Sequence, residues 1–138
     1  MHRLIDLAMP FSLAVLGTCG LSAHAGVEYA TEVLLIEEPT GVSSVDFGYS
    51  IAASGDWVAV GAPSDSAAGY LAGAVHLYKW DVGAFELIET IRADDPADYD
   101  YFGFDVAMDG DMLVIGSPGN DGYAINSGAV YVYHFDDF

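Results

Sequence analysis

The stretch FGYSIAASGDWVAVGAP, at residues 47–63, recurs 55 residues later as FGFDVAMDGDMLVIGSP, at residues 102–118. The register continues without a gap through residues 80 and 135, and 11 of these 34 aligned positions are identical. Most other positions exchange similar residues, as Val60 and Ile115 do. Because chance rarely places several spaced glycine motifs in one register, we interpret the second stretch as a duplicate of the first.

Each copy has the pattern of short β-strands joined by tight turns. In the first copy, apolar runs at residues 49–53 and 57–60 flank Ser54-Gly55-Asp56, and the second copy has Asp109-Gly110-Asp111 at the same place. An Asp-Gly pair between apolar runs is typical of a β-hairpin. Pro63 ends the second strand, because proline has no amide hydrogen to donate to the hydrogen bonds between strands.

Further apolar runs complete a unit of four strands. Residues 74–80 and 85–91 predict a third and a fourth strand on either side of a turn at residues 81–83. Residues 32–38 resemble the fourth strand, and we expect them to form an extra outer strand that completes the last sheet. The expected fold is all-β: two four-stranded antiparallel propeller-like blades in fourth-strand-first order, a partial propeller with blades at about 47–92 and 102–135.

The first 25 residues have the pattern of a secretory signal peptide. Arg3 precedes a largely apolar stretch, and Ala23-His24-Ala25 fits a cleavage site that leaves residues 26–138 as the mature chain. We therefore expect a secreted, periplasmic or cell-surface protein without a membrane span in the mature chain. A retained membrane anchor and lipidation at Cys19 are the alternative interpretations.

The charge excludes some partners. The formal net charge is −18, and Lys79 and Arg92 are the only basic residues (histidine apart) after the signal segment. A chain this acidic repels phosphate backbones and anionic membrane surfaces, so nucleic acid is not expected as a partner. Cys19 is the single cysteine, so the mature chain has no disulfide of its own.

The motifs resemble the FG-GAP repeat, the blade unit of the integrin α-subunit propeller and of many secreted bacterial proteins. Phe47-Gly48 with Gly61-Ala62-Pro63, and Phe102-Gly103 with Gly116-Ser117-Pro118, carry the resemblance. It implies extracellular binding and adhesion by a ring of about seven blades. Two blades cannot close a ring alone, so a homo-oligomer, a trimer or a tetramer, is one expectation and a propeller fragment is another.

The family's calcium loop is absent. Many such blades carry an Asp-x-Asp-x-Asp-Gly loop between the two motifs, whereas here the turns hold at most two carboxylates. No cofactor is therefore expected. The remaining metal candidate is the acidic run with Asp94, Asp95, Asp98 and Asp100, for which a solvated linker is the alternative interpretation.

Candidate ligand-binding residues lie in the two loops that follow the Gly-x-Pro motifs: Asp65, Tyr70, Asn120, Asp121 and Tyr123. The alternative is that the polar ones only shape turns. The strand aromatics are expected in the core. His76 and His134 are expected to be ordinary sheet residues, because neither histidine recurs in the other copy.

The sequence is compatible with three functions. The first is a secreted binding or adhesion module that acts through its inter-strand loops on an extracellular protein or glycan. The second is a structural or assembly unit without a ligand of its own, and the third is a hydrolase. We expect no enzyme, because the sequence has no nucleophile motif, no zinc-spaced histidine and cysteine set and no phosphate-binding glycine loop.

Overall fold

A computed structural model describes residues 34–39 and 45–135. The expected signal peptide and cleavage site lie outside the described residues. The described part is all-β, and it holds no helix able to cross a membrane. Its strands are β1 (Ile51–Ser54), β2 (Trp57–Ala62), β3 (Ala74–Asp81), β4 (Ala84–Ile91), β5 (Asp105–Asp109), β6 (Met112–Ser117) and β7 (Ala129–His134).

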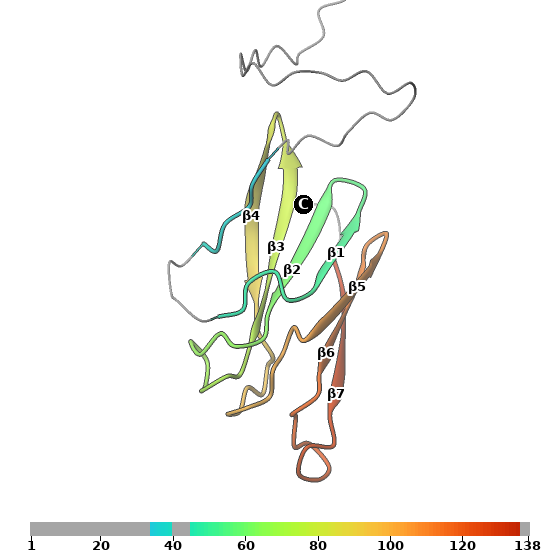
Figure 1. Cartoon of the computed structure of the whole chain (residues 1–138). Coiled ribbons are helices and arrows are strands. Elements are labelled where there is room, and N and C mark those ends of the chain that lie inside the picture. The colour runs from blue at the N-terminus through green and yellow to red at the C-terminus, as the bar shows by residue number, and fades with distance from the viewer. Residues whose placement is uncertain (1–33, 40–44, 136–138) are drawn as a thin grey trace, which may run out of the picture. The chain divides into compact units, whose positions relative to one another are not determined.

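The strands form two antiparallel sheets in sequence order. The first sheet has four strands, β1-β2-β3-β4, and the second has three, β5-β6-β7 (Figure 1). Gly55 and Gly110 make the tight turns of the β1–β2 and β5–β6 hairpins with φ of 56° and 59°. Glycine takes this left-handed conformation without strain, which explains the glycine in both turns.

The two copies have the same backbone pairing. Ile51 pairs with Val60 in the first sheet, and Val106 pairs with Ile115 in the second. The amide that opens each copy also pairs identically: Gly48 donates to the Gly61 carbonyl at 3.0 Å, and Gly103 to the Gly116 carbonyl at 3.1 Å. The duplication predicted from the sequence is therefore a duplication of structure.

The core lies between the two sheets. Alternate residues along a strand point to opposite faces, so each strand sends one set of side chains into this layer. The aromatic rings of Trp57 and Phe135 meet across it at a centroid distance of 4.9 Å. The buried residues of the layer are Trp57, Ala59, Val75, Leu77, Ala93, Phe102, Val106, Leu113 and Ile115.

One part of the expected fold is wrong. Residues 34–38 form no strand, so they do not complete the second sheet, which has three strands; residues 32–33 lie outside the described part. Glu38 instead lies near enough to His76 and Tyr78 to affect their titration, beside the first sheet. The Val45 carbonyl accepts from the Ser64 amide at 3.2 Å. Glu38 therefore lies near β3 of the first sheet, and Val45 contacts the loop that follows β2.

Candidate functional site

The long connections of both sheets lie at one end of the strands. Residues 63–73, 92–104 and 118–128 join β2 to β3, β4 to β5 and β6 to β7, whereas the tight turns lie at the opposite end (Figure 1). We call these the loop end and the turn end. Every candidate ligand or metal residue predicted from the sequence lies at the loop end. Loops held by rigid sheets are the common position of binding residues.

Asp65 and Asn120 are buried and shape their loops. Oδ1 of Asp65 accepts from the Ala67 amide at 3.0 Å, and Oδ1 of Asn120 accepts from the Gly122 amide at 3.0 Å. Both residues are almost fully buried. The two side chains occupy equal positions of the repeat and make the same turn, which is the structural role that Asp and Asn commonly have in loops.

Different groups make the further contacts of these two side chains. Arg92 approaches Oδ1 of Asp65 at 3.4 Å, which partly compensates the buried carboxylate. Nδ2 of Asn120 donates to the Tyr131 hydroxyl at 3.2 Å, and that hydroxyl donates to Oδ1 of Asp95 at 2.7 Å. Burial, followed by the hydrogen bond to Asp95, raises the pKa of Tyr131. The phenol is therefore neutral and remains a donor at physiological pH.

Three of the four carboxylates of the acidic run accept from different partners. Asp95 accepts from Tyr131, Asp98 accepts from the Tyr70 amide at 2.8 Å, and buried Asp100 accepts from the Ala97 amide at 2.8 Å. Within residues 34–39 and 45–135, no three metal-ligating side chains gather at one point. Calcium binding by this run, including Asp94, stays a prediction.

An exposed pair of tyrosines joins two loops. The rings of Tyr70 and Tyr99 meet edge to face at 5.2 Å, and both side chains are at least half exposed. Their backbones are tied as well, because the Tyr99 amide donates to the Tyr70 carbonyl at 2.7 Å. The amide of Tyr101 likewise donates to the Leu71 carbonyl at 3.1 Å. These bonds fix the position of the pair.

Sequence reasoning selected Tyr70 but missed Tyr99. The signal was present, because Tyr99 is an aromatic residue inside the polar run at residues 94–100, where a core position is not expected. The third loop carries the remaining two candidates. Asp121 accepts from the Asn126 amide at 2.5 Å, and Tyr123 is fully exposed.

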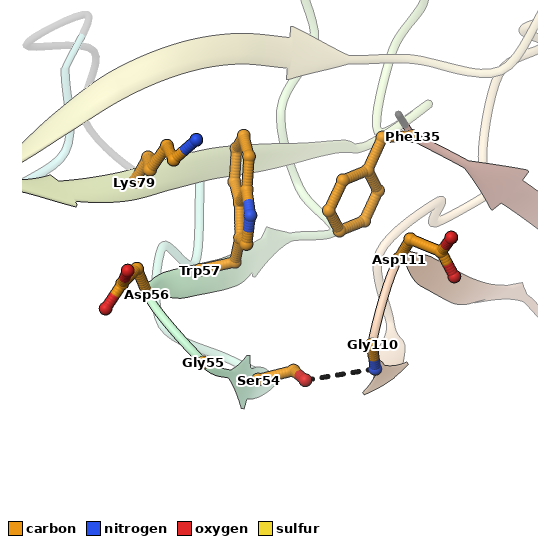
Figure 2. A pocket seen from close by; sticks show the side chains of 8 residues that line it. All are labelled: Ser54, Gly55, Asp56, Trp57, Lys79, Gly110, Asp111 and Phe135. Carbon is orange, nitrogen blue, oxygen red and sulfur yellow. Dashed lines mark hydrogen bonds between the residues drawn. The ribbon is translucent and has the colours of Figure 1, made fainter. Parts of the chain in front are cut away.

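The turn end holds an open pocket of about 930 Å³ between the two hairpins. Figure 2 shows the ring of Trp57 between the Lys79 ammonium and the ring of Phe135. The Lys79 Nζ lies 4.7 Å from the Trp57 ring centroid, a cation–π geometry. Ser54 Oγ accepts from the Gly110 amide at 3.0 Å and links the two turns. Trp57 is buried, so its ring offers no free face to a ligand.

The histidines fill different places in the sheets. His76 is fully buried on β3, and its Nδ1 lies 3.0 Å from Thr90 Oγ1. Burial lowers the pKa of His76, and neighbouring Asp65 and Glu38 offset part of this effect. His134 lies on β7 with Nε2 2.8 Å from Asp111. The two positions are not equivalent in the repeat, so they do not form a duplicated site.

Two duplicated antiparallel sheets, packed face to face with the long loops at one end, define an all-β repeat protein of blade-like units. A family model described as the FG-GAP repeat matches residues 38–78 and 85–133, one match on each copy. The chain belongs to the FG-GAP repeat family. Repeats of this family are generally binding or adhesion modules and are typically non-catalytic. No curated protein matches the chain.

Proposed function

We propose that this protein is an extracytoplasmic binding or adhesion module whose loop end contacts an extracellular protein or glycan. The observation that carries the proposal is the exposed pair of Tyr70 and Tyr99, which hydrogen bonds hold in place between two loops. Aromatic side chains with few rotatable bonds give contact area at low entropic cost, which is why they are frequent in binding surfaces.

The surroundings of the pair favour a partner that offers hydrogen-bond donors or positive charge. Asp98 holds the Tyr70 backbone, and Asp94 and Asp95 lie on the same connection with exposed surfaces. Complementary charge increases the rate of association and the selectivity of such contacts. The pattern of a signal segment in the sequence supports a position outside the cytoplasm.

The experiment is a screen of the purified chain against arrays of glycans and extracellular proteins, followed by affinity measurements on each hit. We expect Tyr99→Ser to weaken binding about tenfold, because loss of one anchoring aromatic removes on the order of 1–2 kcal/mol. Tyr70→Ser is expected to have a similar effect.

The matched control is Val82→Asn, which changes an exposed residue at the turn end. It is expected to leave affinity unchanged, and circular dichroism checks that all three variants fold. Binding that depends on Val82 but not on the tyrosines, or an array without any hit, would contradict the proposal.

A structural role without a ligand is the second candidate. It is favoured by the exposed apolar face of the second sheet, which includes Met112, Val130 and Val132.

A further inference from the structure

The start of the second copy fills a slot on the first sheet. The Phe102 amide donates to the Ala72 carbonyl at 2.8 Å, and the Gly103 carbonyl accepts from Ser50 Oγ at 2.8 Å. A Cβ atom at Gly61 would overlap the Gly103 carbonyl oxygen. Only glycine at position 61 therefore leaves room for the Phe-Gly segment of the next copy.

The equivalent slot on the second sheet is open. A pocket of about 440 Å³ lies there, lined mainly by apolar surface that includes Phe104, Gly116, Gly128 and Val130. Gly116 is the equivalent of Gly61, yet a Cβ atom at Gly116 would meet nothing closer than the Asp105 carbonyl oxygen at 3.7 Å. The glycine is retained, but no group of the described chain uses the space.

The face around the open slot is apolar and exposed. Its side chains occupy repeat positions whose counterparts on the first sheet are buried against the second sheet. Val75 is 0% exposed and its equivalent Val130 is 67% exposed, while Leu77 is 2% and Val132 is 61% exposed. Trp57 is 6% exposed, against 45% for Met112. On the first sheet, the equivalent face is covered by the core-facing side of the second sheet. The repeat thus indicates that a sheet of the same kind would fit the exposed face.

The chain also carries a second Phe-Gly segment in the docking conformation. Gly48 and Gly103 both have φ of +86°. Phe47 packs on the ring of His76 at 5.5 Å, as Phe102 packs on the equivalent ring of Tyr131 at 5.1 Å.

The surroundings of the two glycines differ in one respect. A Cβ atom at Gly103 would lie 2.5 Å from the Ala74 carbonyl oxygen of the first sheet, whereas one at Gly48 has no atom of residues 34–39 or 45–135 within 4 Å. Phe47-Gly48 therefore has the conformation of a docked segment, but the described part of the chain places no slot beside Gly48.

We propose that the open slot on the second sheet binds the Phe47-Gly48 segment of a second copy of this chain. The contact continues the interface that already joins the two sheets within one chain. It is heterologous, because the slot of one copy meets the Phe-Gly segment of the next, and repetition gives a ring or a filament. This assembly is independent of the binding function proposed above.

Two features weaken the contact between molecules. Asp105 stands where the first sheet has Ser50, so a carboxyl group faces the Gly48 carbonyl of the second molecule in place of a hydroxyl donor. The net charge of −18 on each chain adds long-range repulsion. Association therefore strengthens with ionic strength, as salt screens this long-range repulsion.

The experiment is sedimentation velocity on the purified chain over a range of protein and salt concentrations. The wild type is expected to exceed the mass of a monomer in a concentration-dependent way. Gly116→Ala fits the isolated chain but blocks the slot, and we expect it to weaken association at least about tenfold. Asp105→Ser supplies the missing donor and is expected to shift association to lower concentration.

Ala84→Ser is the matched control, since it adds one heavy atom at an exposed position of β4, outside the slot. A mixing test then separates head-to-tail contact from other association. Gly48→Ala keeps the slot and loses the segment, so an equal mixture of Gly48→Ala and Gly116→Ala is expected to stop at dimers. A wild type that stays monomeric up to about 100 µM overturns the proposal, as does a Gly116→Ala variant that assembles like the wild type.

Discussion

At the scale of single residues, buried His76 links stability to pH. Its Nε2 atom has no hydrogen-bond partner among the described residues, and burial lowers the pKa of the ring. Asp65 and Glu38 raise that pKa and Arg92 lowers it, but these effects are smaller than that of burial. The folded chain therefore holds the ring neutral where the unfolded chain, with a pKa of about 6.5, begins to bind a proton.

The sign of the pH effect follows from that difference. The unfolded chain binds more protons below about pH 6.5, so stability is complete above this pH and declines as the pH falls towards the lower, folded pKa. We expect the melting temperature of the wild type to fall between pH 7.5 and pH 5.5, and that of His76→Gln to fall less. Val82→Asn, an exposed control that removes no titratable group, should show the pH dependence of the wild type. Parallel curves for wild type and His76→Gln would contradict the assignment.

At the scale of elements, the stability of each sheet depends on the other. The core layer contains Trp57 and Leu77 from the first sheet and Leu113 and Ile115 from the second. Each sheet alone would expose the apolar face that this layer covers, at a cost of about 25 cal/mol for every Å². The two sheets are therefore expected to unfold together.

Fluorescence can report this coupling, because both tryptophans, Trp57 and Trp80, belong to the first sheet. Leu113→Ala in the second sheet leaves a cavity and should cost about 2–5 kcal/mol. We expect it to shift the urea midpoint seen by tryptophan fluorescence by the full amount. Val132→Ala, on the exposed face, should change stability by less than about 0.5 kcal/mol. An unshifted fluorescence transition in Leu113→Ala would show that the sheets unfold separately.

The sequence predicted the turns and strands that depend on local pattern. It did not predict the features that depend on which segments meet in space. The turn at Gly55 follows from glycine chemistry, and the apolar run at residues 57–60 predicts the strand that the structure shows over Trp57–Ala62. The repeat carries both predictions to residues 110–117. Residues 34–38 have the composition of a strand but form none, because strand pairing depends on spatial neighbours that local composition does not encode. The contact of Tyr99 with Tyr70 joins two loops, and no local pattern encodes it.

At the scale of the whole molecule, two equal units have unequal surroundings. The slot on the first sheet is filled by the second copy, and the slot on the second sheet is open within the described chain. The candidate binding surface lies at the loop end and involves different residues from the exposed apolar face. Binding and assembly can therefore be tested by separate variants of one chain.

The equivalence of the two units, with one slot filled and one open, is tested most directly by the thermal unfolding of Gly61→Ala and Gly116→Ala at a protein concentration low enough for monomers. Gly61→Ala drives a methyl group into the backbone of the second repeat of the same chain. It should lower the free energy of unfolding by about 1–3 kcal/mol or more. Gly116→Ala meets open space and should change stability by less than about 0.5 kcal/mol. Equal losses in the two variants would contradict the account.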